Sequence, residues 1–177
     1  MRNGRLESPV KLQLSETQAL ERLGSDLGRC ILELEALRGS LVLFSHASGE
    51  SAWQFKHPTI GDAYATLLMQ SPEHLDIFIQ GSAPDRLIDQ VTCGDVGLEK
   101  AIVVPKSLFP PMLARLREML QSRSYKTAWL STFGAKRDLQ GFLANRCSKE
   151  FLSLYLKDNP DLLDQVLVEA GYMDELH

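Results

Sequence analysis

The longest regular pattern of apolar positions lies near the start of the chain. Ser15 and Gln18 form a capping-box pattern that marks the start of a helix, and Gly39 marks its end. Between them apolar residues recur at steps of three and four, which predicts one long helix with a leucine seam. The seam packs within the molecule or pairs two copies in a coiled coil; we favour packing, because it covers only about three heptads. It consists of Leu20, Leu23, Leu27, Cys30 or Ile31, Leu34 and Leu37.

The rest of the chain alternates between strand-like and helix-like patterns. Residues 1–14 are polar and carry a glycine and a proline, which predicts a flexible arm before a single globular domain over 15–177. The polar segment 45–58 is expected to be a loop. The alternation predicts an α/β (α+β) fold, with a mixed sheet of about four strands, flanking helices and a helical C-terminal cap. Strands are expected at 41–44, 75–80, 101–104 and 126–131, and helices at 60–70, 84–90, from 110 onward, and at 134–146, 148–157 and 161–170.

Composition and charge narrow the classes of function. The chain has 177 residues, of which 44% are apolar and 24% charged, as in ordinary globular proteins. Its formal net charge of −4 means that contact with phosphate must come from a local basic patch. The cysteines, Cys30, Cys93 and Cys147, are odd in number and widely spaced, which argues against a disulfide framework and a zinc site. No apolar run approaches the ~20 residues of a membrane span, so we expect a cytoplasmic protein without a transmembrane segment.

The stretch most suggestive of chemistry is the predicted turn between the last strand and the helix after it. The backbone N–H groups at a helix start lack intrahelical partners, and glycine lets a phosphate approach them closely. Thr132 can donate its hydroxyl to phosphate, Lys136 adds a point charge, and Arg137 can bind two phosphate oxygens. The alternative is an ordinary turn glycine beside a solvated basic surface. The candidate phosphate-binding residues are Thr132, Gly134, Lys136 and Arg137.

Residues 115–149 are basic within an acidic protein, and aromatic side chains lie among them. Such a mixture can follow a nucleic-acid backbone and stack bases, although the aromatic residues are equally expected in the core. A nuclease would also need carboxylates to hold Mg²⁺. The spacing of the acidic residues in the middle of the chain does not select any, so the metal ligands stay unknown. These acids are Glu73, Asp76, Asp85, Asp89, Asp95 and Glu99.

The adjacent Ser45 and His46 do not make a convincing hydrolase motif. A nucleophile elbow requires G-x-S-x-G, which is absent here. Neighbouring side chains in an extended segment also point to opposite sides, so these two cannot bond to each other by proximity alone. The chain has neither a P-loop nor a G-x-G-x-x-G pattern, so it lacks the sequence motifs of P-loop NTPases and of Rossmann dinucleotide enzymes.

A strand that ends in a short G-x-x-R turn and opens a helix resembles the phosphate-binding motif of the ParB/sulfiredoxin superfamily. Here the motif is Gly134-Ala135-Lys136-Arg137, and the segment PPMLARLREMLQS before it is similar in placement to the helix that precedes the motif in that family. The resemblance covers about residues 100–146. Asp138 departs from the family pattern, in which many members carry a second basic residue. The turn also lacks a counterpart of the sulfiredoxin cysteine.

The resemblance implies binding of ATP and DNA, with Mg²⁺ as cofactor. It also implies a possible ATPase or DNase activity, that is, hydrolysis of a phosphoester, in which Arg137 is the catalytic residue. Plasmid-encoded members act in fertility inhibition, which implies suppression of conjugative or T-DNA transfer.

An alternative from a different class is a non-catalytic protein–protein interaction module. In it the seam and the C-terminal helices dock a protein partner or a second copy of the chain. The seam residues concerned are Leu20, Leu23, Leu27 and Leu34.

Overall fold

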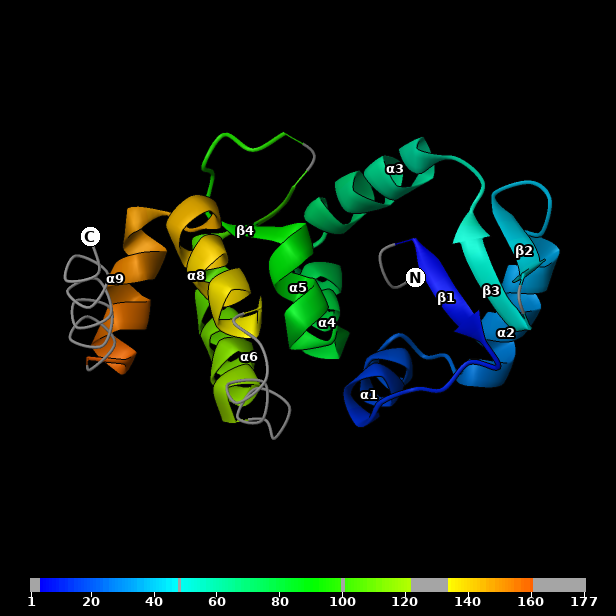
Figure 1. The fold of residues 1–177 in the computed structure, drawn as a ribbon, viewed down its shortest axis with the longest axis horizontal. Helices are drawn as coiled ribbons and strands as arrows, with labels where there is room; N and C mark the ends of the chain where they lie inside the picture. The colour runs from blue at the N-terminus through cyan, green and yellow to red at the C-terminus, as the bar shows by residue number, and fades with distance from the viewer. Residues whose placement is uncertain (1–3, 48, 100, 122–133, 161–177) are drawn as a thin grey trace, which may run out of the picture.

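The fold was analysed in a computed structural model that describes residues 4–47, 49–99, 101–121 and 134–160 (Figure 1). It is a mixed α/β structure, as the alternation predicts. The elements in chain order are β1 (Arg5–Ser8), α1 (Leu14–Arg22), α2 (Leu27–Ala36), β2 (Val42–Ala47), β3 (Glu50–Phe55), α3 (Pro58–Met69), α4 (Pro72–Gly81), α5 (Pro84–Gln90), β4 (Val91–Cys93), β5 (Ile102–Val104), a 3-10 turn η1 (Lys106–Leu108), α6 (Phe109–Gln121), α8 (Gly134–Arg146) and α9 (Lys149–Asp158).

The described strands form two small sheets instead of one mixed sheet of about four strands. In the first sheet β3 lies between β1 and β2, and both pairings are antiparallel. In the second sheet β4 and β5 are parallel, with Val91 opposite Ile102. Figure 1 shows the first sheet at the N-terminal end of the molecule, whereas β4 lies among the helices.

The main hydrophobic core lies among helices α3 to α9 and the β4–β5 pair. Ile79, Leu87 and Val91 are completely buried there. Phe109 and Phe151 meet edge to face, with ring centroids 5.0 Å apart. Helix α6 turns an apolar face inward, as the sequence predicts, and α8 and α9 form the described part of the predicted C-terminal cap.

The prediction of a strand at 75–80 is wrong, because these residues belong to helix α4. Ser71 caps the helix by accepting a hydrogen bond from the N–H of His74 at 3.2 Å, and Pro72 occupies the first turn. The helix packs against α1, α3 and α6. Neighbouring helices therefore cover α4 on several sides. A helix in such a place can have apolar residues at alternate positions, a pattern that otherwise indicates a strand.

Two helices replace the single long helix expected at the N-terminus. Helix α1 ends before Gly24, which has a positive φ of 67° and provides the left-handed turn that ends many helices. Asp26 then caps α2 by accepting a hydrogen bond from the N–H of Arg29 at 2.9 Å. Of the segment expected to be a flexible arm, residues Arg5–Ser8 form strand β1.

The segment 45–58, expected to be a loop, contains most of a β-hairpin formed by β2 and β3. Trp53 on β3 is 2% exposed and packs against Phe44 on β2, with ring centroids 4.7 Å apart. The predicted strand at 126–131 and the predicted helix at 161–170 lie outside the described residues. No helix within the described ranges is both long enough and apolar enough to cross a bilayer.

Candidate functional site

The predicted phosphate site lies at the start of α8. The structure describes this helix over Gly134–Arg146, the range in which the sequence predicts a helix, and Lys136 and Arg137 lie in its first described turn. No acidic residue lies in that turn, and Asp138, which follows it, is exposed. The first turn of a helix generally has backbone N–H groups without intrahelical partners, which is what an anion site requires. Thr132, the fourth candidate, lies outside the described residues.

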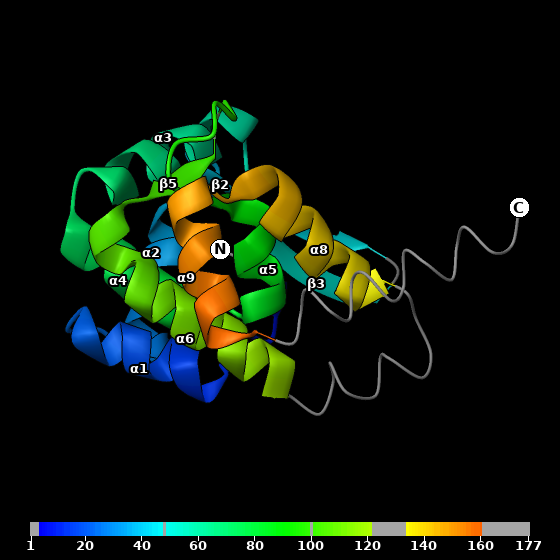
Figure 2. The same ribbon diagram turned by 90° about the vertical axis from the view of Figure 1, so that its left-hand side faces the viewer.

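The later turns of α8 hold the helix in place. Leu139 is 4% exposed and Phe142 is 2% exposed, and both belong to the main core. The helix lies against α5, as Figures 1 and 2 show, and it also contacts β4. In its last turn Arg146 donates a hydrogen bond from Nη1 to the carbonyl oxygen of Val91, at 3.4 Å. Burial of the later turns therefore fixes the direction in which the first turn points.

A cleft of about 600 Å³ lies between α1, α4 and α6. Arg115 of α6 lines it, is only 9% exposed, and donates hydrogen bonds to the carbonyl oxygen of Ser82 and to the carboxylate of Glu118. On the opposite side Arg22 lines the cleft and pairs with Asp76. Each guanidinium thus already has a carboxylate partner, so the cleft shows no surplus of positive charge for an anionic ligand.

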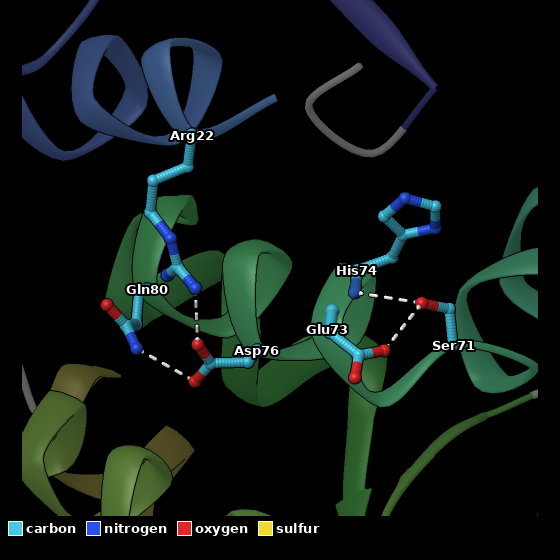
Figure 3. A network of polar contacts seen from close by, with 6 residues as sticks. All are labelled: Arg22, Ser71, Glu73, His74, Asp76 and Gln80. Atoms are coloured by element: carbon cyan, nitrogen blue, oxygen red, sulfur yellow. Dashed lines mark hydrogen bonds and ion pairs between the residues drawn. The ribbon is translucent and has the colours of Figure 1, made fainter. Parts of the chain in front are cut away.

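Asp76 joins α1 to α4, as Figure 3 shows. Its carboxylate accepts hydrogen bonds from Nη2 of Arg22 and Nε2 of Gln80, each at 2.8 Å. Nearby, Ser71 donates a hydrogen bond to the carboxylate of Glu73 at 3.2 Å, at the start of α4. Two of the acidic residues considered as metal ligands therefore have structural partners in this helix.

A second cleft, of about 710 Å³, lies between the first sheet, α3, α5 and the segment before β5. Asp89 and Glu99, two more of the acidic candidates, line it together with Asp62, Arg5 and Arg146. Its lining thus combines both signs of charge. Among the described residues, no group of three or more histidine, cysteine, aspartate or glutamate side chains is placed to hold a metal ion.

The hairpin brings His46 and Ser51 together, a contact that the sequence analysis missed. They face each other across β2 and β3, and Nδ1 of His46 lies 2.8 Å from Oγ of Ser51. Ser45 instead donates to the carbonyl oxygen of Ala52 at 3.4 Å, which confirms that the adjacent Ser45 and His46 do not bond to each other. The register of the hairpin makes this contact, and sequence spacing alone does not reveal a register.

The leucine seam is divided between α1 and α2, and neither helix contains a fully buried residue. Leu23 is 50% exposed, whereas Leu20, Leu27 and Leu34 are partly buried. The most exposed leucines, Leu14 at 76% and Leu32 at 72%, do not belong to the seam. The three-and-four pattern therefore missed the most accessible apolar side chains of this region.

Comparison with known proteins gave no relative: no family model, no curated protein and no solved structure matches the chain.

Proposed function

We propose that the chain binds the phosphate of a nucleotide or of DNA at the first turn of α8, as the ParB/sulfiredoxin superfamily does at the motif that residues 134–137 resemble. The observation that supports this proposal is the position of residues 134–137 in the first described turn of α8. Lys136 and Arg137 lie in the first turn, and no acidic residue accompanies them there. Positive side chains then add to the positive end of the helix dipole, and this combination favours an anion.

In this proposal each residue of the turn has a distinct task. The backbone N–H groups around Gly134 receive phosphate oxygens, and Thr132 donates its hydroxyl to them. Lys136 offsets the phosphate charge, and Arg137 stabilises the negative charge that develops when a phosphoester is hydrolysed. Mg²⁺ would accompany ATP and offset the charge of its phosphates. We assign the ion no protein ligand, because the described carboxylates do not gather into a metal site.

The biological role proposed from the same resemblance is that of a cytoplasmic, plasmid-encoded ATPase or DNase that suppresses conjugative or T-DNA transfer. This role depends on phosphate binding, so binding is the property to test first.

The test is a thermal-melt titration with ATP and ADP, each with and without Mg²⁺. A ligand that binds only the folded chain stabilises it by about 2.7 kcal/mol at a hundredfold excess over Kd. We expect the melting temperature to rise by about 5–11 °C, since a chain of this size gains about 2–4 °C per kcal/mol. Arg137→Ala should abolish the rise. Arg29→Ala is the matched control, because it removes one exposed guanidinium from α2, at the opposite end of the molecule (Figure 1).

Two results would refute the phosphate site. One is a melting temperature that does not change up to millimolar nucleotide. The other is an equal loss of the rise in Arg137→Ala and Arg29→Ala, which would indicate binding through general charge.

A second candidate function is the interaction module, and the exposure of leucines on α1, directly after it and on α2 favours it. Leu14, Leu23 and Leu32 are each at least half exposed, and apolar side chains exposed in this way are available to a partner. If the module pairs with a second copy, sedimentation should show concentration-dependent dimers that Leu23→Glu abolishes. A protein that stays monomeric at all concentrations, and from which no partner is recovered, would contradict it.

A further inference from the structure

Cys93 and Cys147 are distant in the sequence but lie opposite each other in the structure. Cys93 is the last residue of β4, and Cys147 lies between α8 and α9. The two form an isolated parallel bridge, and the N–H of Ser148 donates to the carbonyl oxygen of Cys93 at 2.8 Å. Paired strands lie about 4.7–4.9 Å apart. This spacing falls within the ~4.4–6.8 Å between Cα atoms that a disulfide can bridge.

Gly94 allows the α8–α9 junction to come this close to β4. Its φ is +85°, a left-handed conformation that other residues rarely adopt. A Cβ atom added at Gly94 would lie 2.8 Å from both Cβ and Oγ of Ser148. Any larger residue would therefore push the junction away from β4. The closeness of the two cysteines is a consequence of packing that this glycine permits.

The two thiols also interact with each other. Both are free and buried, with Cys93 0% and Cys147 7% exposed. Burial raises the pKa of the Cys93 thiol, and its hydrogen bond with Cys147 raises it further. Cys147 is the more accessible of the pair and is therefore the first to meet an oxidant. Cys30, the third cysteine, lies apart on α2, where its sulfur is 3.6 Å from Oγ of Ser25.

We propose that Cys93 and Cys147 are a redox modification site: a hydroperoxide converts them to a reversible disulfide that fastens the α8–α9 junction to β4. The sulfur of Cys147 attacks one peroxide oxygen and becomes a sulfenic acid, and hydrogen peroxide leaves as one water. The sulfur of Cys93 then attacks the Cys147 sulfur, and the displaced hydroxyl leaves with the thiol proton as a second water. Two thiols lose two electrons, which reduce one peroxide. Neither cysteine belongs to the proposed phosphate site, so this inference does not depend on that function.

The test uses the full chain carrying Cys30→Ser, in which the pair are the only thiols. After treatment with hydrogen peroxide, we expect the number of thiols per chain that react after denaturation to fall from two to none. The mass of the chain should fall by about 2 Da, because two hydrogens are lost. Dithiothreitol should restore both thiols. Non-reducing digestion should yield one linked pair of peptides containing Cys93 and Cys147. Adding Cys93→Ser is the control that should remove the linkage.

Three outcomes would overturn the proposal. One is the survival of both thiols in the folded protein under conditions that oxidise the denatured chain. Another is a disulfide that joins two chains, and the third is conversion to sulfonic acids without a linkage. Should either variant fail to fold, digestion of the oxidised unmodified chain decides the question, because it distinguishes a Cys93–Cys147 linkage from one that involves Cys30.

Discussion

The contact between α1 and α4 offers the sharpest test of the fold, because it depends on one missing side chain. Gly81, the last residue of α4, has no Cβ, and one built there would lie 2.5 Å from Cβ of Ala19 on α1. Real Cβ atoms do not approach one another so closely, and both atoms belong to short side chains that cannot rotate away. The substitution Gly81→Ala therefore forces α1 to move relative to α4.

The change in stability expected for Gly81→Ala is the difference between two opposing effects. Alanine is favoured over glycine within a helix by about 0.5–1 kcal/mol, and the gain is smaller at a terminal position. Overpacking a close contact costs about 1–3 kcal/mol. The net loss is about 1.5 kcal/mol, which for a chain of this length lowers the melting temperature by about 3–6 °C. Gly141→Ala, also in a helix, should raise the stability by about 0.5–1 kcal/mol, because among the described residues nothing outside the adjoining stretch of its own helix lies within 4 Å of the added Cβ.

Urea unfolding of four proteins tests the contact directly: the unmodified chain, Gly81→Ala, Ala19→Gly and the double variant. Ala19→Gly alone should cost about 1 kcal/mol of helix propensity. In the Gly81→Ala background the substitution Ala19→Gly also removes the clash. The free energy of unfolding lost in the double variant should therefore be smaller than the sum of the two single losses by at least about 1 kcal/mol. The reasoning is refuted if Gly81→Ala stabilises the chain as Gly141→Ala does, or if the two losses simply add.

Two further substitutions test the core beneath α8 and the buried guanidinium of the first cleft. Phe142→Ala should destabilise the chain by about 3–5 kcal/mol in urea unfolding, whereas Leu154→Ala, at a position 40% exposed, should cost less than about 1.5 kcal/mol; equal losses would contradict the core assignment. Arg115→Ala should cost about 1–3 kcal/mol, because it leaves the carbonyl oxygen of Ser82 without this donor. Glu118→Ala keeps that donor but leaves the buried guanidinium without its carboxylate partner, so it should also destabilise the chain; unchanged stability in Arg115→Ala would contradict the assignment of Arg115.

The helices that the sequence predicted correctly carry strong local signals. Helix α5 has a proline in its first turn, and α8 is helical throughout the described part of the predicted range and ends at Arg146, as expected. Strand β5 was found because Ile102 and Val104 form part of a short apolar run bounded by polar residues and a proline. In each case local propensity and tertiary packing favour the same conformation.

The errors arise where packing overrides a local pattern. In α4 the residues Leu75, Ile77 and Ile79 alternate like a strand, yet Ser71-Pro72 starts a helix. The helix is compatible with that alternation because neighbouring helices cover several of its sides. Strand β4 has only three residues, too few to show any period, and it is completely buried. Its sequence therefore gives no signal that separates it from the end of α5.

The cysteines show why a site made by tertiary packing cannot be read from spacing. Spacing detects pairs that share one helix, strand or loop, and about 50 residues separate Cys93 from Cys147. What joins them is a single bridge between β4 and the α8–α9 junction. That bridge forms only if the junction between α8 and α9 lies beside β4. It also requires a glycine at position 94, which leaves room for Ser148. The odd number of cysteines, which argued against a disulfide framework, is compatible with one reversible disulfide, because Cys30 lies apart from the pair.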